Sequence, residues 1–347
     1  MKTILITGGA GFIGSHAAEE FSNQGWHVTV LDNLSRSSLF NFKKKSVEYN
    51  WQFLSTLKNV ELVRADIRDG KKIKKVFQKR KFDLVIHAAS QPGIRKSIES
   101  PLEDFEINAV GTLNVLEALR KTNPKGAFVY LSTNKVYGEN VASIPLREKK
   151  SRYEYRHVKG VSEKMSVDLT GHTPYGASKY AGDLYTQEYG ITYGLRTAVF
   201  RMSCIYGTRQ FGFEDQGWIA WFIIAALTGK PIHIYGNGKQ VRDALYVKDL
   251  ISAIQCFYQS KINHGVWNIG GGPEHTASLL ELVGFIEKLL SRKLKLHYSD
   301  WRPMDQRVYI TDISKLKREF NWRPVWTVQR GVKLLFDWVE ENKRLFQ

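Results

Sequence analysis

A glycine-rich turn near the N-terminus constrains the fold more than any other feature of the sequence. Residues 7–14 read TGGAGFIG and lie between a short β-branched run at 3–7 and a segment with helical patterning at 15–24. Gly8 allows a tight turn, Gly11 lets the backbone approach a ligand, and Gly14 lets a helix pack closely on a strand. The turn therefore predicts a strand and a helix that open a parallel α/β sheet.

The alternation of strands and helices continues through the first part of the chain. Further β-branched runs lie at 28–32, 60–65, 84–87, 127–132 and 197–200. Strands that alternate with helices imply crossover connections and a sheet that helices cover on both faces. After about residue 200, Gly, Trp and Tyr become denser and helical segments predominate. We therefore predict an α/β fold, in which a Rossmann-type doubly wound parallel sheet is followed by a smaller mixed α/β C-terminal domain.

The turn and the end of the next predicted strand together indicate a dinucleotide. The helix after the turn would direct the N–H groups of Phe12, Ile13 and Gly14, with its positive dipole end, at phosphate oxygens. Asp32 ends the next predicted strand, where a carboxylate accepts hydrogen bonds from both ribose hydroxyls and repels a 2′-phosphate. The sequence therefore predicts NAD rather than NADP, although Arg36 lies close enough in the sequence to weaken that preference.

A tyrosine and a lysine four residues apart form a second chemical motif. Tyr175 and Lys179 share one face if their segment is helical. A tyrosine with its ordinary pKa of about 10 is a poor base at neutral pH, but a neighbouring ammonium group and oxidised NAD stabilise the phenolate. The phenolate can then take the proton of a hydroxyl while a hydride leaves the same carbon. Thr133, which follows a predicted strand, can place its hydroxyl against the same substrate oxygen.

Composition excludes several classes of function. The net charge is +17 over 347 residues, but the lysines and arginines are scattered and accompany no aromatic stacking motif or recognition-helix pattern. We interpret them as a solvated surface and expect no nucleic-acid partner.

The longest apolar run, 218–227, is too short to cross a bilayer. Cys204 and Cys256 lack metal-ligand spacing. We expect a cytoplasmic protein with no membrane association and no metal site.

Together these motifs resemble the extended short-chain dehydrogenase/reductase family over nearly the whole chain. The matching segments are TGGAGFIG at 7–14, DNLS at 32–35, DI at 66–67, INAVGT around Asn108, STNKVYG around Thr133 and YGASK at 175–179. The resemblance implies that the helices bearing Asn108 and Tyr175 form a homodimer interface. It also implies further cofactor-binding residues, namely Asn33, Ser35, Arg36, Asp66, Ile67, Ala88, Ala89, Ser90 and Asn108.

The C-terminal half resembles the nucleotide-sugar epimerase branch of that family. The stretch YGNGKQVRD contains Gln240 and Arg242, and WRPMDQR contains Arg302 and Asp305. The resemblance implies that the two arginines bind the substrate diphosphate through charge-assisted hydrogen bonds, with Asp305 near the nucleotide ribose. A helix and a strand predicted within 247–268 return the chain to the first domain. We therefore expect an NAD-binding domain at 1–200 and 241–268 and a nucleotide-sugar-binding domain at 201–240 and 269–347.

Within that branch, the segments 104–118, 206–222, 236–245 and 305–313 resemble the CDP-tyvelose 2-epimerases. The resemblance implies inversion of carbon 2 of a CDP-linked hexose, of the CDP-paratose to CDP-tyvelose type, through transient oxidation to a keto-sugar and re-reduction from the opposite face. It places six residues near the substrate, namely Thr133, Asn134, Lys135, Cys204, Arg209 and Gln210.

Two departures from related enzymes narrow the expected chemistry. Sugar-nucleotide 4,6-dehydratases carry an Asp-Glu pair where this chain has Asn134 and Lys135. Because elimination of water needs an acid and a base there, dehydration is not expected. Cys204 stands where many relatives use Asn, and we expect it to leave room in the pocket rather than to act as a nucleophile.

Two alternatives stay open at this point. A UDP-sugar 4-epimerase would use the same catalytic residues and differ in the carbon presented to the nicotinamide, and the segment 209–218 favours the 2-epimerase. A catalytically silent dinucleotide-sensing regulator would keep the glycine turn but lose Tyr175 or Lys179. Both residues are present, which favours an enzyme.

Overall fold

A computed structural model describes residues 1–40, 45–302 and 305–347, and the side chains of residues 45–47 lie outside the description. The chain divides into two compact units. Unit 1 comprises Met1–Val136, His172–Arg201 and Ile251–Trp267, and unit 2 comprises Tyr137–Gly171, Met202–Leu250 and Asn268–Gln347. Compared with the predicted boundaries, residues 137–171 and 241–250 belong to the second unit.

A seven-stranded sheet, in the order β12-β8-β5-β4-β1-β2-β3, forms the centre of unit 1. The pairs β4–β5, β1–β4, β1–β2 and β2–β3 are parallel, so the predicted fold class is confirmed. The inner strands β4 and β5 are buried throughout, as expected for a sheet covered on both faces. The strands are β1 (Thr3–Thr7), β2 (His27–Asp32), β3 (Val60–Arg64), β4 (Leu84–His87), β5 (Ala127–Thr133), β8 (Arg196–Met202) and β12 (His264–Ile269).

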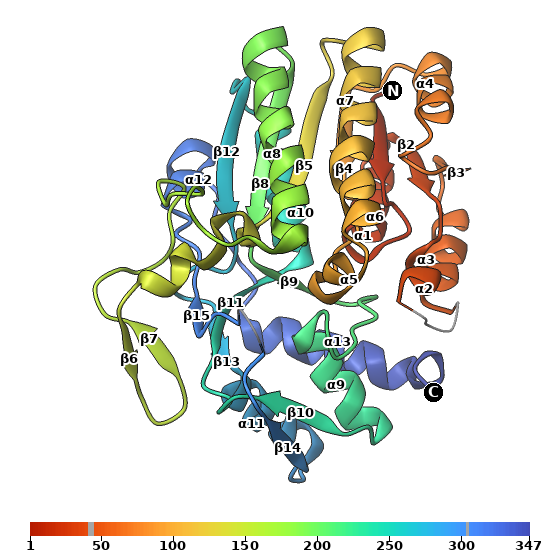
Figure 1. The fold of residues 1–347 in the computed structure, drawn as a ribbon. Helices are drawn as coiled ribbons and strands as arrows, with labels where there is room; N and C mark the ends of the chain where they lie inside the picture. The colour runs from red at the N-terminus through yellow and green to blue at the C-terminus, as the bar shows by residue number, and fades with distance from the viewer. Residues whose placement is uncertain (41–44, 303–304) are drawn as a thin grey trace. The chain divides into compact units, whose positions relative to one another are not determined.

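The helices of unit 1 pack on this sheet, and α7 and α8 run side by side in front of it (Figure 1). Their facing residues join a core with the sheet that includes Leu116, Tyr130 and Tyr189. The helix that bears Asn108 is interrupted by one π-helical turn, η1 (Glu106–Val110). The helices are α1 (Phe12–Asn23), α2 (Arg36–Leu39), α3 (Lys45–Ser55), α4 (Gly70–Lys79), α5 (Ile94–Glu99), α6 (Pro101–Phe105), α7 (Gly111–Thr122), α8 (Thr173–Tyr193) and α10 (Val247–Gln259).

Unit 2 is mixed, as the sequence predicts. Strand β11 lies beside β9 and β15 in parallel and beside β13 in antiparallel orientation, and β10 pairs with β14. The strands are β6 (Leu146–Glu148), β7 (Tyr153–Tyr155), β9 (Cys204–Tyr206), β10 (Ile232–Tyr235), β11 (Val241–Tyr246), β13 (Thr276–Ser278), β14 (Leu296–Ser299) and β15 (Val308–Tyr309). The helices are η2 (Asn134–Ser143), α9 (Trp218–Thr228), α11 (Leu279–Leu290), α12 (Ser314–Phe320), α13 (Val328–Glu341) and η3 (Lys343–Leu345).

The long polar segment that precedes Tyr175 is an ordered part of unit 2. Its hairpin, β6–β7, is antiparallel, and the Tyr155 hydroxyl donates to the carbonyl of Val308 at 2.9 Å. At the hairpin's end, the backbone N–H of Tyr153 donates to the carbonyl of Lys239 at 2.9 Å. The segment is therefore attached to Lys239, next to Gln240, and to β15, the strand that pairs with the Arg242 strand β11.

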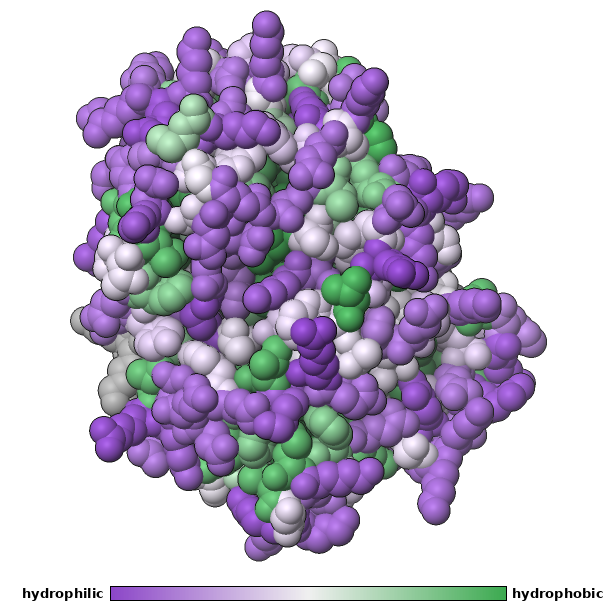
Figure 2. All heavy atoms as spheres, turned by 180° about the vertical axis from the view of Figure 1, so that it is seen from behind, coloured by the Kyte–Doolittle hydropathy of each residue, from purple (hydrophilic) through white to green (hydrophobic). Residues whose placement is uncertain are grey.

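Hydrophilic side chains cover most of the face shown in Figure 2, and apolar residues form separate small groups there. In the described part of the chain, no helix combines the length and the apolar composition needed to cross a membrane.

Candidate active site

The glycine turn packs so tightly that side chains are excluded from it. Gly8 has a φ of +64°, and a Cβ on it would lie 2.5 Å from the backbone nitrogen of Ala89. A Cβ on Gly14 would lie 2.6 Å from the Cα of Gly9. The N-cap residue of α1 is Gly11, which offers no side-chain cap, so the first N–H groups of the helix, at Phe12, Ile13 and Gly14, remain for a ligand. The turn fits a pyrophosphate.

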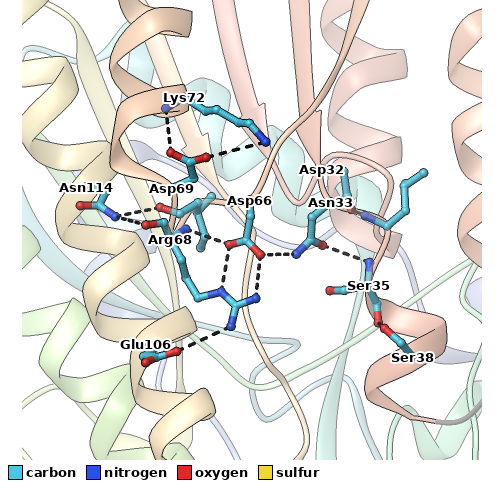
Figure 3. Close-up of polar contacts among 12 residues, drawn as sticks. Asp32, Asn33, Ser35, Ser38, Asp66, Arg68, Asp69, Lys72, Glu106 and Asn114 are labelled. Atoms are coloured by element: carbon cyan, nitrogen blue, oxygen red, sulfur yellow. Dashed lines mark hydrogen bonds and ion pairs between the residues drawn. The ribbon is translucent and has the colours of Figure 1, made fainter.

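A hydrogen-bonded cluster of polar side chains follows the ends of β2 and β3 (Figure 3). Asp32 accepts from the N–H groups of Ala10 at 3.0 Å and Leu34 at 2.8 Å, which fastens the carboxylate to the glycine turn. Burial raises the pKa of Asp32, and these backbone hydrogen bonds oppose the rise. A carboxylate held at this point fits the ribose hydroxyls that the sequence assigns to it.

Asn33 joins Asp32 to the predicted adenine-binding pair, Asp66 and Ile67. Its amide donates to Asp66 at 2.9 Å, and its oxygen accepts from the N–H of Ser35 at 3.0 Å. Burial would raise the pKa of Asp66, but two hydrogen bonds from the Arg68 guanidinium, at 2.8 and 3.1 Å, are the main reason that the value falls to about 2. Arg36 begins α2, and burial lowers its pKa only to about 10, so it is a cation at neutral pH.

Replacing Asp32 with alanine is expected to weaken NAD binding by about 10- to 100-fold, because a hydrogen bond to a charged group contributes about 1.5–3 kcal/mol. Calorimetric titration of the NAD-free protein measures the change. Asp69→Ala is the matched control, since Asp69 caps α4 through the N–H of Lys72 at 3.0 Å and has no predicted cofactor role. Equal NAD affinity in Asp32→Ala and the unaltered protein would remove Asp32 from the site.

The predicted cofactor loop, Ala88-Ala89-Ser90, is tied to β1 by a buried histidine. His87 Nε2 lies 3.0 Å from the Thr112 hydroxyl, which itself donates to the carbonyl of Asn108 at 2.6 Å. Nε2 must therefore carry the proton, and Nδ1 accepts from the Thr7 hydroxyl at 2.7 Å. Burial lowers the pKa of His87 to about 3, which keeps the ring neutral, as this arrangement requires.

Asn108, a predicted cofactor-binding residue, makes its hydrogen bonds inside unit 1. Its oxygen accepts from the N–H of Gln91 at 2.9 Å, and its amide lies 3.1 Å from the carbonyl of Gln91 and 3.0 Å from the Ser178 hydroxyl. With 1% of its surface exposed, the side chain connects the loop after Ser90 to α8. Asn108 therefore links the loop after Ser90 to the helix that carries Tyr175 and Lys179.

The structure brings Thr133 and Tyr175 together. Thr133 ends β5, and Tyr175 lies in the first turn of α8. Burial raises the pKa of Tyr175 to about 12, and the nearby Thr133 side chain opposes the rise. The Thr133 hydroxyl also lies 3.4 Å from the Asn134 oxygen and accepts from the backbone N–H of Lys135 at 3.2 Å.

Lys179 lies one helical turn after Tyr175 and is buried, with 3% of its surface exposed. Its ammonium group donates to the carbonyl of Leu131 at 2.7 Å and lies 4.3 Å from the centre of the Tyr130 ring. Burial lowers the pKa of Lys179 to about 7, and the nearby Asp183 and Asp104 raise it. A buried lysine and a partly exposed tyrosine whose pKa values are both shifted are typical of catalytic groups.

A buried ion pair behind Lys179 was not found by sequence reasoning. Asp183 is completely buried and receives two hydrogen bonds from the Arg201 guanidinium, at 2.9 and 3.1 Å. The Ser132 hydroxyl donates to the same carboxylate at 2.8 Å. These contacts join α8 to β8 and β5, and so fix the helix that carries Tyr175 and Lys179.

In unit 2, the two predicted phosphate-binding arginines are each held by a carboxylate. Arg242 donates to Asp305 at 2.7 Å, so the predicted ribose partner lies against the predicted phosphate partner. Arg302 pairs with Asp215 at 3.1 Å, and its guanidinium stacks 3.9 Å from the centre of the Tyr235 ring. Both guanidinium groups are therefore oriented before a ligand binds.

Two glutamines in unit 2 have oxygen atoms that suit a ligand. The amide nitrogens of Gln210 and Gln240 donate to the carbonyls of Ile205 and Tyr235. Their buried Oε1 atoms have no hydrogen-bond partner within the described residues. Arg209, beside Gln210, is buried in a left-handed conformation with a φ of +58°.

Cys204 begins β9, and burial raises the pKa of its thiol to about 12. The group is therefore a thiol at neutral pH. A thiol is a poor nucleophile, which agrees with the expectation that Cys204 does not attack the substrate.

Comparison with known proteins finds one family model and relatives that are named as nucleotide-sugar epimerases. Residues 4–270 match the family described as the NAD dependent epimerase/dehydratase family. The CDP-paratose 2-epimerase of Salmonella typhi is 40% identical, across 96% of this chain and 98% of its own. A putative UDP-glucose 4-epimerase of Methanocaldococcus jannaschii is 32% identical, across 98% and 99%. The crystal structure of a UDP-glucose 4-epimerase from Thermotoga maritima with UDP-glucose superimposes with a TM-score of 0.82 at 29% identity, across 98% and 99%.

Proposed function

Because the chain belongs to the NAD dependent epimerase/dehydratase family, with NAD as its cofactor, we propose that it inverts carbon 2 of a CDP-linked hexose, as in the conversion of CDP-paratose to CDP-tyvelose. The observation that carries this proposal is the 40% identity to a CDP-paratose 2-epimerase over nearly the full length of both chains. The positions of the proposed catalytic residues support it, since Tyr175 and Lys179 lie one turn apart on α8 and Thr133 ends the neighbouring strand β5.

The residues of unit 1 that would hold the cofactor fit its chemistry. The turn at Gly8–Gly14 and the start of α1 would take the pyrophosphate, Asp32 the ribose hydroxyls, and Asp66 and Ile67 the adenine. Bound NAD would supply an acceptor that takes a hydride from carbon 2 and returns it to the same carbon. Lys179 would hold the nicotinamide ribose and, with its positive charge, favour the Tyr175 phenolate.

Tyr175 would act as the base in the first half of the reaction and as the acid in the second. Its phenolate takes the proton of the carbon-2 hydroxyl as that carbon is oxidised, and Thr133 donates a hydrogen bond to the reacting oxygen. The keto-sugar then turns over, and Tyr175 returns the proton when the opposite face is reduced. Arg242 and Arg302 would hold the diphosphate during this rotation, which keeps the intermediate bound.

A UDP-sugar 4-epimerase is the second candidate, because relatives with that name match across nearly the whole chain. Product analysis with CDP-paratose, CDP-glucose and UDP-glucose side by side separates the two. We expect inversion of CDP-paratose at carbon 2. We expect turnover of UDP-glucose to be at least about tenfold slower, which is the effect of losing one hydrogen bond to the substrate. Conversion of UDP-glucose to its 4-epimer as the fastest reaction would replace this proposal by the second candidate.

We also propose a homodimer through the helices that bear Asn108 and Tyr175. Large apolar side chains on α6 and α8 are exposed in the single chain, with exposed fractions of 72% for Leu102, 47% for Phe105 and 64% for Ile191. Leu184 and Tyr185 on α8 add to this set, at 41% and 49%. Exposed apolar residues gathered on neighbouring helices are typical of an interface.

Replacing both Phe105 and Leu184 with glutamate is therefore expected to convert the dimer to a monomer, because it places a charge on the exposed apolar residues of both α6 and α8. Sedimentation velocity measures the change. Val325→Glu, at an exposed apolar residue of unit 2 (64% exposed), serves as the control and should leave the dimer intact. A double variant that sediments like the unaltered chain would place the interface elsewhere.

A further inference from the structure

Asp104, on α6, is a carboxylate buried at the back of the proposed catalytic pair. Its exposed fraction is 1%. Oδ1 accepts from the Gln91 amide at 2.7 Å and from the Asn108 amide at 3.1 Å. Oδ2 accepts from the hydroxyl of Ser178, the residue immediately before Lys179 in the chain. No feature of the local sequence separates Asp104 from an ordinary exposed helix residue.

We propose that Asp104 is a positioning residue, whose buried negative charge acts on Tyr175 and Lys179 while its hydrogen bonds hold α8 in place. This inference rests on the proposed function, since it assumes that Tyr175 and Lys179 carry the chemistry. It adds a third charged residue to the pair, one that neither the glycine turn nor the Tyr-x-x-x-Lys motif contains.

The hydrogen bonds around Asp104 fit an ionised carboxylate. Both oxygens lie within hydrogen-bond distance of donor groups, as a carboxylate requires. Burial raises the pKa of Asp104, and the hydrogen bonds of Ser178 and Gln91 oppose the rise. Ser178 Oγ lies 3.0 Å from the Asn108 amide and 3.1 Å from the carbonyl of Tyr175, so Asp104, Asn108 and Ser178 form one connected cluster. Because the cluster is buried, the effective dielectric constant is low and the charge acts over several ångströms.

The sign of the effect follows from electrostatics. Burial is the largest influence on the pKa of both residues, raising that of Tyr175 and lowering that of Lys179. The negative charge of Asp104 raises both pKa values, because it disfavours the phenolate and favours the ammonium group. The other titratable groups that face the pair are Asp183 on α8, His87 on β4 and Tyr130 on β5.

Neutralising Asp104 should therefore lower both pKa values together. In Asp104→Asn, we expect the rising and falling limbs of the kcat/KM–pH profile to move to lower pH by roughly 0.5–1 unit, as expected for the loss of one nearby buried charge. A spectrophotometric titration of the tyrosinates in the NAD-bound protein, read as the difference from Tyr175→Phe, should show the same displacement without depending on turnover.

Three further variants separate charge from shape. Glu103→Gln is the matched control, because Glu103 lies beside Asp104 on α6 but pairs with Lys96 at the surface, at 3.7 Å; its profile should not move. Ser178→Ala removes a hydrogen-bond donor to Asp104 but no charge, so both limbs should move less than in Asp104→Asn. Asp104→Ser supplies a second neutral side chain if Asp104→Asn does not fold.

The outcomes distinguish this inference from the function on which it rests. If Tyr175→Phe is inactive and both neutral Asp104 variants keep the unaltered profile and titration, the inference is wrong and the proposed function stands. If Tyr175→Phe stays active, the proposed catalytic pair itself is wrong. Displacement of the limbs in opposite directions would also contradict the inference, since a single negative charge raises both pKa values.

Discussion

Substitution of Tyr175 by phenylalanine is expected to lower kcat by about 10³-fold, within the 10²- to 10⁴-fold range of a general acid–base group. Phenylalanine keeps the ring and its packing in α8 but removes the hydroxyl near Thr133. Lys179 and the glycine turn are untouched, so NAD should stay bound. Kinetic assays on CDP-paratose, together with the NAD content of the purified protein, measure the two effects separately.

Tyr298→Phe is the control for this experiment. Tyr298 lies on β14, its side chain is 59% exposed, and it has no proposed role in catalysis or in the dimer. We expect its kcat to stay within twofold of the unaltered enzyme, since surface substitutions away from a site have small effects. A Tyr175→Phe enzyme whose kcat is also within a few-fold of normal would show that another group moves the proton.

Replacing Asp183 with alanine is expected to lower the free energy of unfolding by about 3–5 kcal/mol, the cost of breaking a buried ion pair from one side. The change leaves the Arg201 guanidinium, 6% exposed, without its carboxylate and removes the acceptor of the Ser132 hydroxyl. It also removes one of the two negative charges that raise the pKa of Lys179. We therefore expect a loss of activity to accompany the loss of stability.

Urea unfolding, followed by tryptophan fluorescence, measures the change in stability. Asp337→Ala is the control, because its partner Lys333, 2.6 Å away, is 54% exposed and the pair lies on the surface of α13. An exposed pair contributes about 0–1 kcal/mol. Equal destabilisation by the two substitutions would mean that the Asp183–Arg201 pair does not carry the predicted share of stability.

Sequence patterns identify the parts of the fold and of the site whose residues lie close together in the chain. Three features can be recognised from residue types at a short, fixed spacing. They are the glycine turn, the strand that ends at Asp32 and the tyrosine–lysine pair. Their backbones agree with the predictions, since Gly8 has a positive φ and Tyr175 and Lys179 share α8. The parallel sheet follows from the same alternation of strands and helices.

The parts that sequence reasoning missed depend on contacts between distant residues. Asp183 meets Arg201 from a different element, and Asp104 meets Ser178 across 74 positions of the chain. For the same reason, the role of Asn108 as a link between a loop and α8 could not be read from its motif. The attachment of residues 137–171 to unit 2 depends on backbone pairings with Lys239 and Ile310, which no local pattern predicts.

The central claim is that one hydride leaves carbon 2 and returns to it. The most direct test uses CDP-paratose with deuterium at carbon 2, followed by mass spectrometry and nuclear magnetic resonance of the product. We expect slower turnover than with the unlabelled substrate and a carbon-2-inverted product that keeps its deuterium, because the hydride never exchanges with water. A product that loses deuterium to solvent, or one that is inverted at another carbon with no isotope effect, would contradict the account.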